Sequence, residues 1–474
     1  MKLNCQILSD SEKERIHRDS LEILETVGVS VRSDKAIQLL KKRGAIVDEA
    51  DHIVKLPKEM LDQALSTAPR SFLLGARNPD FDFSLPSPAT RYVTASGTFV
   101  IDYHTGQRRP GLLKDLEYSL RISEELDMAA FNWPTVIMHD VSSETRTIRE
   151  WLYSFRFSSK HLQDEVTSIE QIPILIETLS AILGSEDAIK ERGIFSAIYS
   201  TLPPLTHDEQ FCEIYMELAK FHVPIVTIPM PNAGSTGPAS LYSNIAVANA
   251  ESLSALVLFQ MVEPGTPILY GHSAGITNFR LGTFIEGAPE SELMNSALTE
   301  MGHFYDLPVM KGGLATEAKQ PGPQAVMEKI FTSLPSALNG VDICVGLGTL
   351  ETSNLLCLEQ LVVDHEIARL CRRIRDGVDV SDAKDLLEDV KAVGPRGHFL
   401  AQRSTREACR SDEFLQTELF DRNPHERWVE LGKPDVYDKA REKVDEILSV
   451  PLKNPLPDDV LAVFEDIERR IDSH

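Results

Sequence analysis

The sequence predicts an α/β protein, a (β/α)8 TIM barrel with an N-terminal α/β extension and a helical C-terminal tail. Two observations predict the barrel. From about residue 128, short apolar runs alternate with amphipathic stretches of helical periodicity, which is typical of parallel βαβ units. The apolar runs number eight, which is the number of strands that closes such a barrel. An open, doubly wound sheet is the alternative that the same alternation allows.

Each expected strand is a short apolar run bounded by glycine, proline or polar residues. The expected strands lie within 130–138, 161–169, 193–200, 224–230, 266–271, 282–287, 307–313 and 341–348, and the run at 282–287 is the weakest. The expected helices cover 145–158, 170–183, 207–221, 238–262, 288–305, 323–337 and 354–376. We therefore assign the barrel to residues 91–377.

The two ends of the chain differ from this pattern. Residues 1–90 contain three helix-like stretches with short extended pieces, and end in a loop rich in Pro, Ser and Asp at about 78–88. Residues 378–474 are highly charged and contain two stretches of clear helical periodicity, at 433–448 and 456–471. We expect the tail helices to wrap the barrel or to form the contact face of a homo-oligomer.

Composition limits the classes of function. The chain has 474 residues, 42% of them hydrophobic, and a formal net charge of -24. Such an acidic protein repels nucleic acid and anionic membranes. The six cysteines are scattered without CxxC spacing, so neither a zinc ribbon nor a disulfide framework is indicated. The beginning of the sequence lacks the apolar segment of a signal peptide, and no spanning helix is expected. We expect a cytoplasmic protein that acts on a small molecule.

A glycine-rich turn precedes a long helical stretch rich in small residues, within 229–252. Gly234 and Gly237 are three residues apart and no lysine follows, so the turn is not a P-loop. The glycines at 346 and 348 lack the remainder of a GxGxxG motif. The turn is therefore expected to be a strand-to-helix loop at the active-site face of a barrel, in which Ser235 or Thr236 caps the helix.

Two other chemistries stay open as alternatives. A Schiff-base lyase or aldolase would use Lys311, which stands at the end of an expected strand. The thirteen histidines form no HxH or HExxH motif, so a metal site would need residues from separate strand ends. The candidates for that metal site are His139, Asp140, His272 and Cys344. The sequence has no GxSxG elbow for a serine nucleophile.

Aromatic and polar residues gather at the expected strand ends. Aromatic faces hold a quaternary ammonium group by cation–π contact, since such a group donates no hydrogen bond. The aromatic candidates are Tyr199, Tyr270 and Phe284. The polar wall candidates are His272, Glu286 and Asp140. From the residues alone, the sequence indicates a barrel enzyme with a small-molecule substrate.

Several segments resemble the trimethylamine methyltransferase superfamily. The stretch 233–271, "AGSTGPASLYSNIAVANAESLSALVLFQMVEPGTPILYG", is similar to that family's glycine turn, alanine-rich helix and short strand. The stretch 307–329, "LPVMKGGLATEAKQPGPQAVMEK", resembles its strand, glycine pair, lysine and following helix. Front and rear markers stand at 101–116 and 397–405. The similarity covers roughly residues 90–430.

The resemblance implies a (β/α)8 barrel that takes a methyl group from a methylated amine and transfers it to the cobalt of a corrinoid. A separate small protein would carry this corrinoid, in agreement with the absence of a DxHxxG motif here. No metal would be bound by this chain itself. The cofactor and the partner are thus both expectations that the resemblance supplies.

Two departures from the family pattern refine the expectation. The founding trimethylamine enzymes carry pyrrolysine near the seventh strand, whereas this chain has Gly312 and Gly313 in that neighbourhood, and both glycines are candidate substrate-binding residues. This points to relatives without pyrrolysine, which use quaternary amines such as glycine betaine, proline betaine or carnitine. Ser404 stands before Thr405 in the rear marker, where many relatives have histidine, so no role is carried onto that position.

The chemistry of a quaternary amine agrees with these departures. The amine leaves as a neutral tertiary amine, so no general acid is needed, and the protein must orient the methyl group and exclude water. The carboxylate of a betaine needs donors, for which we expect the N–H groups of the turn at 233–238. The expected rim that meets the corrinoid comprises Asn232, Gly234, Ser235 and Thr236. A non-catalytic module that only binds betaine is a further alternative.

Overall fold

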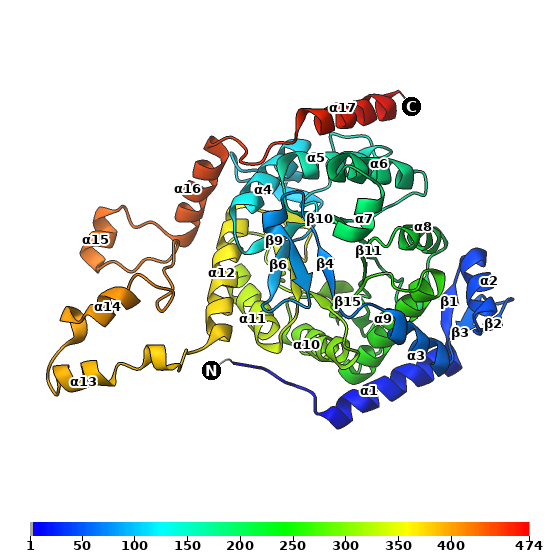
Figure 1. Ribbon diagram of the computed structural model, residues 1–474, viewed down its shortest axis with the longest axis horizontal. Helices are drawn as coiled ribbons and strands as arrows, with labels where there is room; N and C mark the ends of the chain where they lie inside the picture. The colour runs from blue at the N-terminus through cyan, green and yellow to red at the C-terminus, as the bar shows by residue number, and fades with distance from the viewer. Residues whose placement is uncertain (1–2, 474) are drawn as a thin grey trace.

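The computed structural model describes residues 3–473 and contains a closed barrel of eight parallel strands, which confirms the predicted fold class (Figure 1). Its strands are joined in the ring order β10-β11-β13-β15-β18-β19-β6-β9. In chain order the strands are β6 (Arg91–Thr94), β9 (Ala129–Asn132), β10 (His161–Asp164), β11 (Phe195–Tyr199), β13 (Ile225–Thr227), β15 (Ile268–His272), β18 (Val309–Gly312) and β19 (Ile343–Leu347). The chain thus closes the ring by pairing β6 with β19.

One of the eight predicted barrel strands is wrong. The run at 282–287 forms β17 (Thr283–Ile285), which pairs antiparallel with β16 (Gly275–Asn278) in a small sheet outside the barrel. The barrel strand that takes its place is β6, which the sequence did not reveal because it is short and begins with a charged arginine. The other seven runs each contain a barrel strand.

Helices surround the barrel and agree closely with the predicted ranges (Figure 1). They are α4 (Leu113–Glu125), α5 (Arg146–Phe157), α6 (Gln171–Leu183), α7 (Asp187–Arg192), α8 (Glu209–Lys220), α9 (Leu241–Val262), α10 (Pro289–Phe304), α11 (Pro323–Asn339) and α12 (Leu358–Asp376). Helix α9 is long and apolar enough to cross a membrane, but 94% of its apolar window is buried inside the protein. Its small side chains allow α1 to pack against it, where Asn249 donates to Ser20 Oγ at 2.9 Å.

The N-terminal part packs on α9 and closes the bottom of the barrel. It contains α1 (Asp10–Glu22), a π-helical turn (Ile23–Val27), β1 (Val29–Val31), α2 (Asp34–Lys42), β2 (Ile46–Asp48), β3 (Ile53–Lys55), α3 (Lys58–Thr67), β4 (Phe72–Leu74), a 3-10 turn (Pro79–Phe81) and β5 (Phe83–Leu85). Leu74, Phe83 and Leu85 of the β4–β5 hairpin form one apolar cluster with Met310 and Ile343 of the barrel strands. This hairpin fills the end of the barrel opposite the strand C-termini.

The C-terminal part consists of an extended arm and two packed helices (Figure 1). The arm contains 3-10 turns at Asp382–Lys384 and Phe399–Ala401, and the short helices α13 (Leu387–Val393), α14 (Arg403–Ala408) and α15 (His425–Glu430). The packed helices, α16 (Val436–Ser449) and α17 (Asp458–Asp472), bury Val444 and Phe464 and correspond to the two predicted tail helices. The homo-oligomer stays a prediction.

Two small sheets flank the C-terminal end of the barrel. One consists of β14 (Asn232–Ala233), β16 and β17. The other consists of β20 (Thr349–Leu350), β21 (Leu355–Leu356), β7 (Phe99–Ile101) and β8 (Arg108–Pro110). A further sheet joins β12 (Thr206–His207) to β1, β3 and β2 at the N-terminal part. The first two sheets form the walls of the site described next.

Candidate active site

A cavity of about 470 Å³ opens at the C-terminal end of the barrel, where barrel enzymes place their active sites. Residues within or directly after the C-terminal ends of six of the eight barrel strands line it. They are Ala95, Ser96, Trp133, Ile228, Met230, Asn232, Thr236, Ser273, Phe284, Glu286, Gly312, Val345, Thr352 and Ser353. In the described part of the chain, the lining contains two aromatic rings, one carboxyl group and no lysine, arginine or histidine.

Among residues 3–473, Glu286 is the only ionisable side chain in this lining. Its Oε1 accepts a hydrogen bond from Ser273 Oγ at 2.5 Å. Burial raises the pKa of the Glu286 carboxyl group, the Ser273 hydrogen bond lowers it, and the nearby Glu317 raises it further. A carboxylate that is poorly solvated in this way is a favourable partner for a cation.

Glu317 holds the backbone on which Glu286 stands. Its Oε1 accepts hydrogen bonds from the N–H of Glu286 at 2.9 Å and the N–H of Gly287 at 3.0 Å. The N–H of Glu317 in turn donates to Glu328 Oε2 of α11 at 2.9 Å. Helix α11 thus positions the loop that carries the cavity's carboxyl group.

Gly312 leaves room for that carboxyl group. A Cβ atom at this position would lie 2.2 Å from Ser273 Oγ and 2.4 Å from Glu286 Oε1. Neither neighbour can be that close to a carbon atom, so the contact between Ser273 and Glu286 requires glycine at residue 312. Gly313 faces differently, since a Cβ there would lie 2.5 Å from Cys344 Sγ, which is outside the cavity lining.

The structure corrects the predicted aromatic box. Phe284 lines the cavity, but Tyr199 and Tyr270 do not. Both tyrosines are fully buried on the outer side of their strands, where Tyr199 hydrogen bonds His207 at 2.7 Å and Tyr270 donates to Asn249 Oδ1 at 2.7 Å. Successive side chains of a strand alternate between the barrel interior and the helix layer, and these tyrosines stand in the outward register. The cavity's second aromatic ring is Trp133, which the sequence did not single out.

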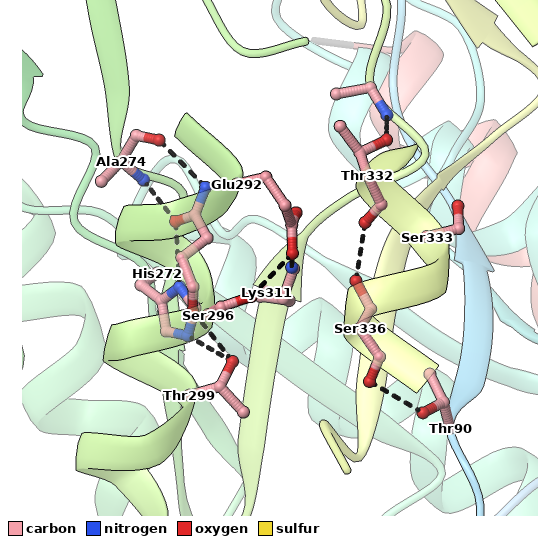
Figure 2. A network of polar contacts seen from close by, with 12 residues as sticks. Thr90, His272, Ala274, Glu292, Ser296, Thr299, Lys311, Thr332, Ser333 and Ser336 are labelled. Carbon is pink, nitrogen blue, oxygen red and sulfur yellow. Dashed lines mark hydrogen bonds and ion pairs between the residues drawn. The ribbon is translucent and has the colours of Figure 1, made fainter. Parts of the chain in front are cut away.

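Two predicted polar wall residues also lie elsewhere. His272 is fully buried between β15 and α10, where its Nδ1 lies 3.1 Å from Asn295 Oδ1 (Figure 2). Burial lowers the pKa of His272 to about 3, so its ring is neutral. Asp140 is exposed and accepts a hydrogen bond from the N–H of Leu113. Of the predicted wall, only Glu286 lines the cavity.

The Schiff-base alternative does not agree with the structure. Lys311 is fully buried on the outer side of β18, and its Nζ donates to both carboxylate oxygens of Glu292, at 2.7 and 2.8 Å (Figure 2). A Schiff base would need this amine in the cavity, which Lys311 does not line. Its role is to neutralise a buried carboxylate of α10.

The metal alternative fails on geometry as well. His139 is exposed on the loop after β9, whereas His272 and Cys344 are buried behind the barrel wall. Among residues 3–473, no group of three or more His, Cys, Asp or Glu side chains is arranged to hold a metal ion. The structure therefore does not bring the four candidates together.

The predicted rim is divided between cavity and hairpin. Asn232 and Thr236 line the cavity, and Asn232 Oδ1 is buried without a hydrogen-bond partner in the described part of the chain. Ser235 accepts a hydrogen bond from Thr277 of the β16–β17 hairpin, and a Cβ on Gly234 would lie 2.6 Å from the Phe279 ring of the same hairpin. Gly234 and Ser235 thus stand beside the mouth of the cavity.

The glycine-rich turn uses three of its N–H groups, which were expected as anion donors, within the turn itself. The N–H groups of residues 234, 235 and 237 donate to backbone oxygens of Gly237 and Asn232 within the turn itself. The following helix begins at Leu241, and its N-cap is Ser240 instead of Ser235 or Thr236. Apart from the N–H of Thr236, a carboxylate would have to find its donors elsewhere in the cavity.

Comparisons with known proteins agree on one family. The model of the family described as trimethylamine methyltransferase (MTTB) matches residues 2–474. A trimethylamine methyltransferase of Desulfitobacterium hafniense is 28% identical over 97% of this chain and 92% of its own length. A glycine betaine methyltransferase of the same species is 27% identical over 94% of this chain and 92% of its own length. These two identities are too similar to choose between the two amines.

A solved structure supports the fold alone. The monomethylamine methyltransferase of Methanosarcina barkeri superposes with a TM-score of 0.51 at 13% identity, over 92% of each chain. The similarity agrees with the closed barrel and its flanking helices.

Proposed function

The chain belongs to the trimethylamine methyltransferase family, and we propose that it transfers a methyl group from a quaternary amine to the cobalt(I) of a corrinoid held by a separate protein. The proposed amine is of the betaine type, such as glycine betaine, proline betaine or carnitine. The observation that carries this proposal is the composition of the cavity, to which the described residues contribute aromatic faces and one carboxylate but no basic group.

The cavity's groups suit a cation that cannot donate hydrogen bonds. Trp133 and Phe284 provide π faces, which attract a trimethylammonium group within about 6 Å of the ring centre. The carboxylate of Glu286 attracts the positive charge of this trimethylammonium group. Ile228, Met230 and Val345 give the rest of the lining an apolar character that excludes water from the methyl groups.

The same groups suffice for the reaction. When the C–N bond breaks, its electron pair stays on the nitrogen and the methyl carbon bonds to cobalt. The leaving amine is neutral, so no residue has to donate a proton, in agreement with a lining without histidine or lysine. The protein's contribution is to hold one N-methyl group toward the open mouth of the cavity. The alternative of a non-catalytic binding module has no such support, because the relatives named above are all methyltransferases.

The activity is tested by mixing the protein with a reduced corrinoid protein and single amines. The panel is trimethylamine, glycine betaine, proline betaine, carnitine and choline, and corrinoid absorbance reports methylation. We expect methylation with one of the carboxylate-bearing quaternary amines and none with trimethylamine. Methylation by trimethylamine alone would reject the quaternary class but keep the family's reaction, and no methylation with a cognate corrinoid protein would reject the proposal.

The corrinoid protein is proposed to dock where the cavity opens. Three large apolar side chains are exposed there, namely Met230 (45%) on the lining and Phe279 (79%) and Leu281 (75%) at the tip of the β16–β17 hairpin. Exposed apolar side chains grouped beside a cavity are typical of an interaction surface. The hairpin tip contacts Gly234 of the predicted rim.

Replacing both Phe279 and Leu281 with alanine should weaken this docking. We expect the KM for the corrinoid protein to rise by at least about tenfold, because two large apolar side chains lose their burial on binding. The affinity for the amine, measured by titration without the corrinoid protein, should stay unchanged. Leu400→Ala, which removes an equally exposed side chain (83%) from the C-terminal arm, serves as the control. An unaltered KM would place the docking surface elsewhere.

A further inference from the structure

A left-handed turn on the cavity wall has no role in the methyl transfer described above. Glu351, Thr352 and Ser353 follow one another with φ values of 53°, 54° and 58°. Residues other than glycine seldom adopt this conformation, and three in succession persist only when the surroundings hold them there. Thr352 and Ser353 both line the cavity.

The segment after β18 holds this turn in place. The N–H of Glu351 donates to the carbonyl oxygen of Ala318 at 2.9 Å, and the N–H of Thr352 donates to that of Thr316 at 2.8 Å. The Thr352 hydroxyl donates to Glu317 Oε1 at 3.4 Å. The same oxygen accepts a hydrogen bond from the N–H of Glu286. The Glu317 carboxylate therefore links the left-handed turn to the loop that carries Glu286.

Ser353 is left with free hydrogen-bond donors. Neither its N–H nor its hydroxyl has a hydrogen-bond partner among residues 3–473. Ser96, on the neighbouring strand end, also lines the cavity and its hydroxyl is equally without a partner in the described chain. The two serines stand on segments in contact, since the N–H of Thr98 donates to the carbonyl oxygen of Asn354 at 3.1 Å.

We propose that Ser353 and Ser96 form a subsite for the carboxylate of the ligand whose ammonium group lies at Glu286. The proposal rests on the proposed function, which it deepens by naming the donors for a betaine's anionic end. Those donors have to be neutral, because no lysine or arginine among residues 3–473 lines the cavity. The glycine-rich turn offers few donors, since the N–H groups of residues 234, 235 and 237 already donate within it and only Thr236 of the turn keeps an uncommitted N–H in the described chain. The strained turn places the two free donors of Ser353 on the cavity wall.

Three probes with the same trimethylammonium head but different arms test this subsite. They are glycine betaine with a carboxylate, choline with a hydroxyl, and tetramethylammonium with neither, and binding is measured by calorimetric titration. For Ser353→Ala and Ser96→Ala we expect a loss of about tenfold in affinity for glycine betaine, since a hydrogen bond to a charged group is removed. The affinity for tetramethylammonium should change less than about twofold, because that probe makes no such bond. Ser381→Ala, at an exposed position of the C-terminal arm, is the matched control and should leave all three affinities unchanged.

Each other outcome has a distinct meaning. If choline instead of glycine betaine loses affinity in the serine variants, the subsite binds a hydroxyl group and the carboxylate assignment is overturned. If the serine variants weaken all three probes equally, or none, the subsite does not exist, while wild-type binding of tetramethylammonium would still support the proposed function. If the wild-type protein binds no probe, the proposed function itself fails.

Discussion

Replacing Glu286 with glutamine is expected to weaken binding of the quaternary amine by about a hundredfold. The change keeps the shape of the side chain and a partner for Ser273, but removes the only charge that the described residues place in the cavity lining. A pair of opposite charges about 5 Å apart contributes about 3 kcal/mol at an effective dielectric constant of about 20, which corresponds to this factor. Calorimetric titration with the preferred amine measures it.

The pH dependence of binding identifies the charge as the cause. A quaternary amine does not titrate, whereas burial raises the pKa of Glu286. Below that raised pKa, protonation competes with the ligand, so affinity should increase as pH rises through it and stay constant above it. The glutamine variant should show no such dependence. Glu290→Gln, an equal loss of charge at an exposed position, should behave as wild type, and an equal loss in both variants would contradict the role of Glu286.

Replacing Gly312 with alanine is expected to abolish measurable methyl transfer. The added carbon would meet Ser273 Oγ and Glu286 Oε1 at distances that no real contact allows, so the carboxyl group must leave its place. The stability should fall by about 1–3 kcal/mol, as overpacking of a well-filled site does. Thermal unfolding and amine titration separate the two effects.

Gly313→Ala is the matched control for this loss. Its added carbon would meet Cys344 Sγ outside the cavity lining, so a similar loss of stability is expected while the contact between Ser273 and Glu286 is kept. We expect the control to retain amine binding. If both variants bind the amine equally well, Gly312 has no role in shaping the site.

The barrel was predictable because its signal is repeated. Seven of the eight expected runs contain barrel strands, and their alternation with helices survives an error at one position. The run at 282–287 was wrongly predicted as a barrel strand, because a short apolar segment has the same sequence pattern in a hairpin strand as in a barrel strand. Strand β6 (Arg91–Thr94) was not predicted, because its four residues include a charged one and follow a loop.

The site was predictable only in part, and the register of the strands explains why. Tyr270 and Ser273 stand three residues apart at the end of β15, and only the serine faces the cavity. Nothing in a single sequence says which of two alternating sets points inward when both contain polar and aromatic residues. Trp133 lies inside the expected strand at 130–138, whereas β9 ends at Asn132, so only the structure places this ring directly after a strand. The left-handed turn at Ser353 has no recognisable pattern in the sequence, because it contains no glycine.

The most direct test of the central claim is a single turnover with the amine that methylates the corrinoid best. The protein, the reduced corrinoid protein and glycine betaine or its preferred relative are mixed, and the amine products are quantified by mass spectrometry beside the corrinoid absorbance. The account predicts one demethylated tertiary amine for each methylated corrinoid. Amine bound in the cavity but left intact, or consumed without methylation of the corrinoid, would contradict it.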